Sequence, residues 1–166
     1  MKKQPEVIKY AIYAIPDPSQ SLKGPGSKLK QNQTMLKWKY PHITMTPFTS
    51  QITKNKKNIS LVELLRKVKT SNWKPSDVAI HKGKELVTLA IKSKSLNNIL
   101  SYLSESGLDT KTNLHVTLGT PEEMKGWSQT ELEDLKNYLS SLNWFLVIAR
   151  MQGNQVEVKT DFMIRI

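Results

Sequence analysis

Cysteine is absent from this chain of 166 residues, which excludes disulfide bonds and thiolate metal sites. No apolar run approaches the roughly 20 residues that a transmembrane helix needs, so we expect no membrane span. Residues 1–6 lead into an alternating, strand-like stretch and not into the apolar core of a signal peptide. Neither a low-complexity segment nor a domain linker interrupts the sequence. These absences favour a cytoplasmic protein in which residues 1–166 form a single domain.

Acidic residues are scarce, because 14 Asp and Glu stand against 25 Lys and Arg, for a formal net charge of +11. A surface with this excess attracts polyanions and accelerates their capture. The excess is greatest in residues 19–40, which hold no acid, and recurs at residues 54–57. The lysines concerned are Lys23, Lys28, Lys30, Lys37, Lys39, Lys54, Lys56 and Lys57. This pattern is typical of a solvated, solubilising surface and equally of a protein whose ligand carries phosphates.

Hydrophobic periodicity predicts strands and helices in irregular succession. Strands are predicted at residues 7–15, 42–47, 77–80, 85–92, 114–119, 144–150 and 155–166. Apolar stripes at helical spacing follow Ser60, Ser95 and Ser128, and both Ser60 with Glu63 and Ser128 with Glu131 fit the capping-box pattern. Residues 16–39, with their prolines, glycines and lysines, are predicted to form one long loop. The absence of regular strand–helix–strand alternation predicts an α+β domain.

Two of the three histidines lie in matching motifs, His42-x-Thr44 and His115-x-Thr117. Successive side chains of a strand point to opposite faces, so each histidine shares a face with its threonine. The intervening residues are apolar and β-branched and are expected to point into the core. Gly119 continues the polar face of the second strand, where its missing side chain would let a ligand come close. Each motif therefore presents one imidazole and one hydroxyl from a rigid strand.

Facing each other across a cleft, these groups would supply the chemistry of phosphodiester cleavage. One imidazole can accept a proton while the other donates one, and the hydroxyls can bind the phosphate oxygens. A zinc site is the alternative, but the motifs lack neighbouring acidic or thiolate ligands and do not match common zinc patterns, so we expect no metal. The G-x-S-x-G signature of Ser-His-Asp hydrolases is absent as well. His81, beside a Lys-Gly-Lys turn, is expected at the surface.

The motifs His42-x-Thr44 and His115-x-Thr117, the latter within the sequence L-H-V-T-L-G, resemble those of the two-histidine phosphoesterase superfamily. The resemblance covers the order of elements over nearly the whole chain. It implies a domain of two similar lobes, in which antiparallel sheets flank a central cleft and helices lie outside. Members cleave 2′,3′-cyclic phosphates, 2′,5′-linked oligoadenylates, U-tailed RNA or cyclic nucleotides without a metal, which implies that no cofactor is needed.

In size and layout the chain is most similar to the small phage anti-CBASS nucleases, which degrade cyclic di- and trinucleotide signals of bacterial immunity. This resemblance implies that Tyr13 and Trp73 hold the bases and that Trp144 is an aromatic residue of the closing segment. Taken alone, Trp73 is equally typical of a lid on the core, and the apolar strand after Trp144 favours its burial. Trp38 is a further stacking candidate, and Lys39 is expected to neutralise phosphate charge with the other lysines of the long loop.

The resulting hypothesis is internal attack on a cyclic oligonucleotide. His42 would remove the ribose 2′-hydroxyl proton, a 2′,3′-cyclic phosphate would form, and His115 would protonate the departing 5′-oxygen while Thr44 and Thr117 bind the phosphate. A monomer is favoured, acting in the host cytoplasm if the chain is phage-encoded. Two alternatives stay open. One is an RNA-processing phosphodiesterase for 2′,3′-cyclic ends or 2′,5′ bonds, and the other is a non-catalytic protein that sequesters nucleotide signals or RNA.

Overall fold

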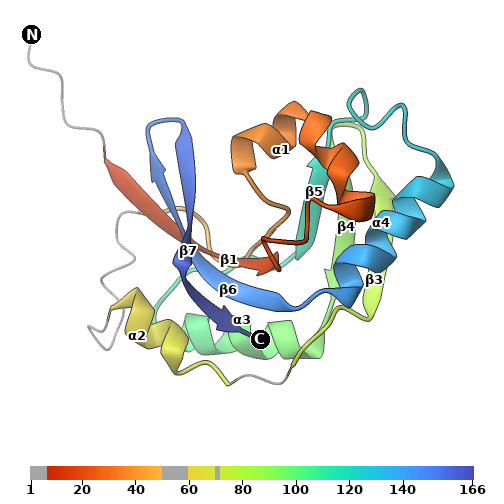
Figure 1. Cartoon of the computed structure of the whole chain (residues 1–166). Helices are drawn as coiled ribbons and strands as arrows, with labels where there is room; N and C mark the ends of the chain where they lie inside the picture. The colour runs from red at the N-terminus through yellow and green to blue at the C-terminus, as the bar shows by residue number, and fades with distance from the viewer. Residues whose placement is uncertain (1–6, 50–59, 70–71) are drawn as a thin grey trace, which may run out of the picture.

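The computed structural model describes residues 7–49, 60–69 and 72–166, which form a seven-stranded antiparallel sheet with helices packed against it (Figure 1). The strand order is β3-β4-β5-β2-β1-β6-β7. The strands are β1 (Ile8–Pro16), β2 (Ile43–Thr44), β3 (Asp77–Lys82), β4 (Val87–Lys92), β5 (His115–Gly119), β6 (Trp144–Gln152) and β7 (Gln155–Arg165). The predicted α+β class is therefore confirmed, whereas the lysines of residues 54–57 lie outside the described residues.

The structure contains one 3-10 helix and four α-helices among the described residues, and three of the α-helices begin at a serine cap. They are the 3-10 helix η1 (Gly24–Gln31) and the α-helices α1 (Gln33–Trp38), α2 (Leu61–Arg66), α3 (Lys94–Glu105) and α4 (Gln129–Ser141). Ser60, Ser93 and Ser128 each accept a hydrogen bond from the backbone N–H three residues later. At Ser128 the carboxylate of Glu131 accepts from the cap's own N–H, which confirms the predicted capping box. No helix within the described ranges is long and apolar enough to cross a membrane.

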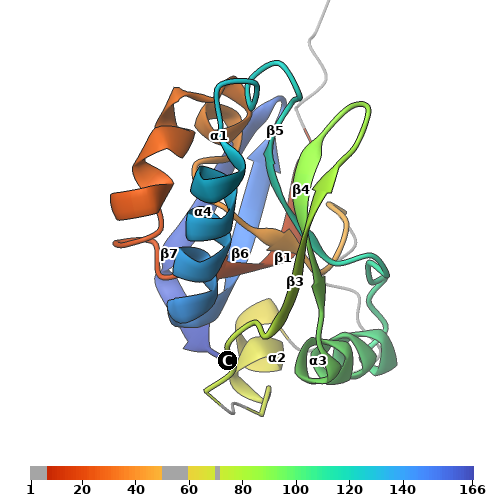
Figure 2. The ribbon, with the colours of Figure 1, turned by 90° about the vertical axis from the view of Figure 1, so that its right-hand side faces the viewer.

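One face of the sheet packs against helices and forms the main core. Ile12, Ile43 and Val116 of the central strands are fully buried on this face. The helices add apolar side chains that include Leu64 and Leu65 of α2, Leu96 and Leu103 of α3, and Leu132 and Leu135 of α4. Figures 1 and 2 show α2 and α3 together along the lower side of the sheet and α1 on its upper side. The opposite face of the central strands carries the two motifs beside a second, smaller cluster of buried residues that includes Ala11, Tyr13 and Ile15.

The motif strands are neighbours at the centre of the sheet. β2 is shorter than the predicted strand and pairs with β1 on one side and with β5 on the other. In the β2–β5 pair, Ile43 lies opposite Val116. This pair joins the β3-β4-β5 half of the sheet to the β1-β6-β7 half. Both motifs thus occupy the junction of the two halves, although a stretch of 70 residues separates them in the sequence.

The prediction of one long loop at residues 16–39 is wrong. Pro25 lies in the first turn of η1, where its missing N–H leaves no hydrogen bond unmade, so the Gly-Pro-Gly sequence begins a helix. Leu29 and Met35 are buried in the main core. Asn32, between η1 and α1, donates a side-chain hydrogen bond to the backbone oxygen of Leu118 at 3.0 Å. These contacts hold both helices beside β5.

Candidate active site

The four motif residues form a square on the sheet face opposite the main core. In the β2–β5 pair Ile43 lies opposite Val116, and extending this register by one residue on each side sets His42, just before β2, opposite Thr117 and Thr44 opposite His115. Opposed residues of antiparallel strands share a face, so the imidazoles lie on one diagonal and the hydroxyls on the other. Diagonal neighbours in such a pair are about 7–8 Å apart. This spacing leaves room for a phosphate group between the two imidazoles.

A backbone carbonyl two residues upstream orients each imidazole. The Nδ1 atom of His42 lies 3.0 Å from the oxygen of Tyr40, and that of His115 lies 2.9 Å from the oxygen of Asn113. A carbonyl oxygen can only accept, so each Nδ1 carries a proton and the Nε2 of the neutral ring is an acceptor. Both rings line one cleft. The motifs therefore share a side-chain restraint as well as a strand position, and each leaves Nε2 for a ligand.

Aromatic side chains enclose His42. The Tyr13 ring of β1 stacks on it with centroids 4.1 Å apart and planes 12° apart, and the Trp38 ring of α1 approaches to 5.6 Å. Phe48 closes the cluster by packing edge-on against Tyr13 at 5.9 Å. Burial lowers the pKa of His42 from the ordinary 6.5 to about 4, with a small further contribution from the charge of His115, while the backbone hydrogen bond opposes the shift. His42 is therefore neutral at pH 7.

A cleft of about 530 Å³ contains the motif residues. Its walls come from α1, from the chain after β2 and from the segment before β5. The further lining residues are Tyr13, Thr34, Lys37, Trp38, Pro47, Phe48, Leu86, Lys111 and Asn113. Apart from the histidines, the ionisable groups of this lining are two lysines and one buried tyrosine, so the cleft suits an anionic ligand. His42 lies in the half-buried part of the cleft, whereas His115 is exposed.

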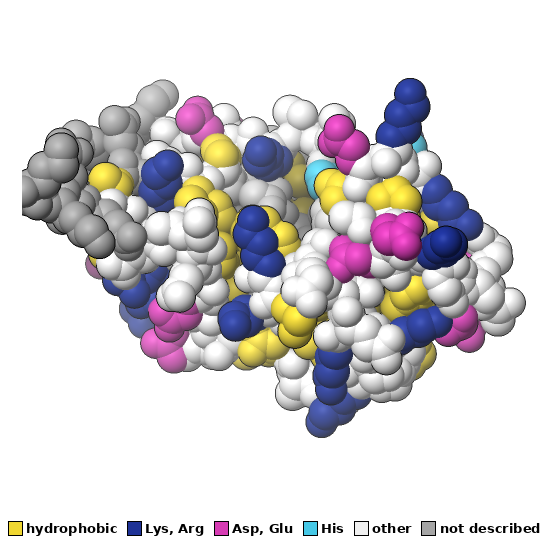
Figure 3. Space-filling view, turned by 90° about the horizontal axis from the view of Figure 1, so that it is seen from above, with side chains coloured by type: hydrophobic (Ala, Val, Ile, Leu, Met, Phe, Trp, Pro, Cys, Tyr) yellow, Lys and Arg dark blue, Asp and Glu magenta, His cyan; other side chains and the backbone are white. Residues whose placement is uncertain are grey.

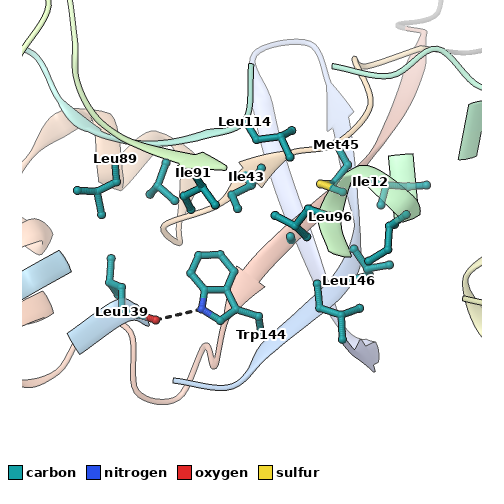
Figure 4. Close-up of a cluster of buried hydrophobic side chains, with 14 of the residues drawn as sticks. Ile12, Ile43, Met45, Leu89, Ile91, Leu96, Leu114, Leu139, Trp144 and Leu146 are labelled. Atoms are coloured by element: carbon teal, nitrogen blue, oxygen red, sulfur yellow. Dashed lines mark hydrogen bonds between the residues drawn. The ribbon is translucent and has the colours of Figure 1, made fainter. Parts of the chain in front are cut away.

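The aromatic residues predicted to hold the bases have other positions. Trp73 and Trp144 pack edge-on with centroids 5.6 Å apart and are only 9% and 1% exposed. In the core, Trp144 Nε1 donates to the backbone oxygen of Leu139 at 3.0 Å (Figure 4). Both tryptophans belong to the main core and neither lines the cleft, which contradicts the contact with substrate that the resemblance implied and confirms the alternatives of a lid on the core for Trp73 and burial for Trp144. Tyr13 does line the cleft, but its exposure of 1% leaves no ring face for a base, and it supports His42 instead.

Gly119 and Lys39 also differ from their predicted roles. A Cβ atom at Gly119 would lie 2.9 Å from Asn32 Nδ2 and 3.2 Å from Glu123 Oε1, so protein atoms fill the space that was assigned to a ligand. Lys39 follows α1 with a φ of 73°, and its N–H donates to the oxygen of Met35 at 2.8 Å. Its side chain is exposed and does not line the cleft. Gly119 therefore allows Asn32 and Glu123 to pack closely against β5, and Lys39 ends α1.

The sequence does not indicate that α1 contributes to the cleft, because residues 16–39 have the composition of a loop. Thr34 and Lys37 of this helix line the cleft beside Trp38. The Glu123 carboxylate accepts hydrogen bonds from Thr34 N at 3.1 Å, Thr34 Oγ1 at 2.5 Å and Thr120 N at 3.0 Å. Burial alone would raise the pKa of Glu123, but these bonds hold it below its usual value. Glu123 thus anchors α1 at the cleft.

The loop before β5 supplies two more lining residues. Lys111 and Asn113 alternate with His115 at period two, a pattern by which the sequence could have identified them. The N–H of Lys111 donates to the oxygen of Met45 at 2.9 Å, which fixes this loop beside β2. His81 is exposed, as predicted, and its register opposite Thr88 puts it on the same sheet face as the motifs.

No three His, Cys, Asp or Glu side chains gather as potential metal ligands within the part of the chain that the structure describes. Neither a scan against models of protein families nor a search among curated proteins found a match for this chain. The assignment of a function therefore depends on the motifs and on the geometry of the cleft.

Proposed function

We propose that this chain is a metal-independent phosphodiesterase of the two-histidine type, which cleaves the 3′,5′ bonds of cyclic di- and trinucleotides. The observation that carries the proposal is the diagonal pair of imidazoles, both oriented through Nδ1 by a backbone carbonyl and both lining one cleft with two threonine hydroxyls. Such a pair can act on opposite sides of one phosphate. The two lobes of the proposed fold are then the two halves of the sheet, which meet at β2 and β5.

His42 acts as the general base. Because its pKa is about 4, the ring is neutral at pH 7, and Nε2 can accept the proton of a ribose 2′-hydroxyl. The 2′-oxygen attacks the adjacent phosphorus, the bond from phosphorus to the 5′-oxygen breaks, and His115, which enters the step with both ring nitrogens protonated, donates its Nε2 proton to that oxygen. The products are a 2′,3′-cyclic phosphate and a 5′-hydroxyl. A bound phosphate raises the pKa of His42 toward neutrality, which makes the imidazole a stronger base when substrate is present.

Thr44 and Thr117 bind the non-bridging phosphate oxygens. Each hydroxyl lies opposite one imidazole in the register, so donors are already in place where negative charge grows. Lys37 and Lys111 add positive charge to the cleft lining. The chain holds 25 Lys and Arg against 14 Asp and Glu, and on the face seen in Figure 3 the Lys and Arg side chains are spread widely over the surface with acidic side chains interspersed. This distribution favours the capture of a polyanionic nucleotide.

Trp38 takes the place of the predicted residues as the platform for a base. It lines the cleft and is only half-buried, and the Nζ of Lys37 lies 5.0 Å from its ring centroid. Stacking of a base on an exposed aromatic ring contributes about 1–3 kcal/mol. A nucleotide base on Trp38 would lie beside His42, because the two rings are 5.6 Å apart.

The test is turnover of cyclic di- and trinucleotides in EDTA, with 2′,3′-cyclic mononucleotides alongside. Acid–base catalysis contributes about 10²- to 10⁴-fold per group, so His42→Ala and His115→Ala should each lower kcat/KM at least 100-fold. That loss corresponds to about 3 kcal/mol of transition-state stabilisation. Thr117→Val should also lower kcat, whereas Thr117→Ser, which keeps the hydroxyl, is the matched control. Circular dichroism establishes that each variant is folded.

EDTA-resistant cleavage that both histidine variants lose would support the proposal. Turnover of linear 2′,3′-cyclic ends alone would make the chain an RNA-processing enzyme, and tight binding without turnover would make it a sequestering protein. A cyclic dinucleotide with 2′-deoxyribose should not be cut. Equal cleavage of that analogue would refute the internal attack.

A further inference from the structure

A second cavity, here called the β4 hollow, adjoins the catalytic cleft on the side of the β3–β4 hairpin. Its volume is about 890 Å³, and it shares Leu86, Asn113 and His115 with the cleft. The turn between β3 and β4 supplies one side of its lining, and Asn97 of α3 with Thr112 supplies another. His115 therefore stands where the two cavities meet.

The sheet makes the floor of the β4 hollow continuous with the catalytic face. Ala90 of β4 lies opposite His115, and Thr88 lies opposite Thr117. These side chains therefore point to the same face as the motifs. The small side chain of Ala90 leaves open the space directly beside the His115 imidazole. A ligand held between the two histidines can extend into the β4 hollow without leaving the sheet surface.

Positive charge predominates in the lining of the β4 hollow. Lys84 and Lys92 contribute two ammonium groups and His81 an imidazole, against the single carboxylate of Glu85. Among the described residues, neither lysine takes part in an ion pair. Their ammonium groups are thus available to a phosphate, and a charge-assisted hydrogen bond to phosphate is among the stronger polar contacts.

We infer that the β4 hollow binds the nucleotide on the leaving-group side of the scissile bond, with Lys84 and Lys92 contacting the phosphate of that nucleotide. The inference rests on the proposed function, in which His115 protonates the 5′-oxygen, because the nucleoside carrying that oxygen must then lie on the His115 side. Cavities of about 300–1,000 Å³ hold small-molecule ligands, so the cleft suits one nucleotide and the β4 hollow a second. The substrate class is accordingly an oligonucleotide with at least two phosphates that occupies both cavities, whereas a cyclic mononucleotide would occupy the cleft alone.

The test compares cyclic di-AMP, which has two phosphates, with 2′,3′-cyclic AMP, which has one. The double variant Lys84→Glu/Lys92→Glu should raise KM for cyclic di-AMP at least tenfold, because each lost contact to a charged group weakens binding substantially. Its kinetics on 2′,3′-cyclic AMP should stay within twofold of wild type. Lys94→Glu is the matched control, because it reverses an exposed charge close to Lys92 but outside the lining, and it should change neither reaction by more than twofold.

An equal loss on both substrates, or the same loss in Lys94→Glu, would overturn the inference while leaving the proposed function intact. If wild type cuts neither these two substrates nor any other cyclic di- or trinucleotide, the proposed function fails, and calorimetric binding of cyclic di-AMP decides the inference separately. Binding that weakens in Lys84→Glu/Lys92→Glu and not in Lys94→Glu would still support a nucleotide site in the β4 hollow. Binding that is unchanged in both variants would overturn it.

Discussion

Acidification should destabilise the fold through His42 in particular. The unfolded chain binds a proton at this residue with the ordinary pKa of 6.5, whereas burial among aromatic rings lowers the folded-state pKa to about 4. Between these values the unfolded state holds a proton that the folded state lacks, so stability falls as the pH falls. The contribution is complete above pH 6.5 and is lost progressively between pH 6.5 and pH 4.

The magnitude follows from the separation of the two pKa values. At 1.36 kcal/mol for each pKa unit, the drop from 6.5 to about 4 corresponds to about 3 kcal/mol of unfolding free energy. The variant His42→Phe removes the titrating group and keeps an aromatic ring for the stack on Tyr13. Between pH 7 and pH 4, wild type should therefore lose about 3 kcal/mol more unfolding free energy than His42→Phe. His81→Gln, which removes an exposed histidine of the same sheet face, is the matched control and should keep the wild-type slope.

Urea unfolding at pH 7, 6, 5 and 4 measures this difference, and the NMR titration of the His42 ring gives its pKa directly. If the difference in unfolding free energy between wild type and His42→Phe stays constant across this pH range, the reasoning is refuted. A pKa above 6 for the His42 ring would refute it as well. The proposed phosphodiesterase activity supplies a second readout, since the pH dependence of kcat/KM reports the pKa values of the free enzyme. As the pH is lowered, kcat/KM should fall near pH 4. The value of kcat should fall at a higher pH, because bound phosphate raises the pKa of His42.

Three further substitutions test the surroundings of the site by urea unfolding. Gly119→Ala places a methyl group 2.9 Å from Asn32 Nδ2 and should cost about 1–3 kcal/mol; an unchanged stability would show that the space is free. Glu123→Ala leaves the donors of Thr34 without their acceptor and should cost about 1–3 kcal/mol, with a rise in the His42 pKa as α1 loosens. Ser21 is fully buried with no hydrogen-bond partner for its hydroxyl among the described residues, so Ser21→Ala should leave stability unchanged or raise it by up to about 1 kcal/mol; a clear loss would reveal a hidden partner.

Strand periodicity made the motif faces predictable, because alternation within a strand is a local property. His42 shares a face with Thr44, and Ile43 between them is fully buried, as the pattern predicted. The square of four residues was not predictable in the same way. It depends on the β2–β5 register, and pairing between strands distant in the chain leaves no signature in either strand alone. The resemblance to a known superfamily supplied only the expectation that the two motifs face each other across a cleft, and the structure places them on adjacent strands with Ile43 opposite Val116.

The failures concern residues whose positions are decided by tertiary packing. α1 has six residues, too few for an apolar stripe to stand out, and it is held in place by Asn32 and Glu123. Trp73 follows a helix in a basic segment, a context equally compatible with a surface loop, and only the packing against Trp144 makes it a core residue. At Gly119 the missing side chain indicates that other atoms come close to the backbone. Those atoms belong to Asn32 and Glu123 and not to a ligand.

The two motifs are alike in sequence and in the hydrogen bond from each imidazole to a backbone carbonyl, but the surroundings of the two imidazoles differ. Both imidazoles donate from Nδ1 to a carbonyl, yet His42 lies under Trp38 and against Tyr13, whereas His115 is exposed at the junction with the β4 hollow. An acid–base pair works only when one member is neutral and the other protonated, and two identical environments would not decide which is which. Desolvation distinguishes the two rings, because it disfavours the charged form of His42. In the proposed reaction, the assignment of His42 as base and His115 as acid then follows from the asymmetric packing of aromatic rings and not from the motifs themselves.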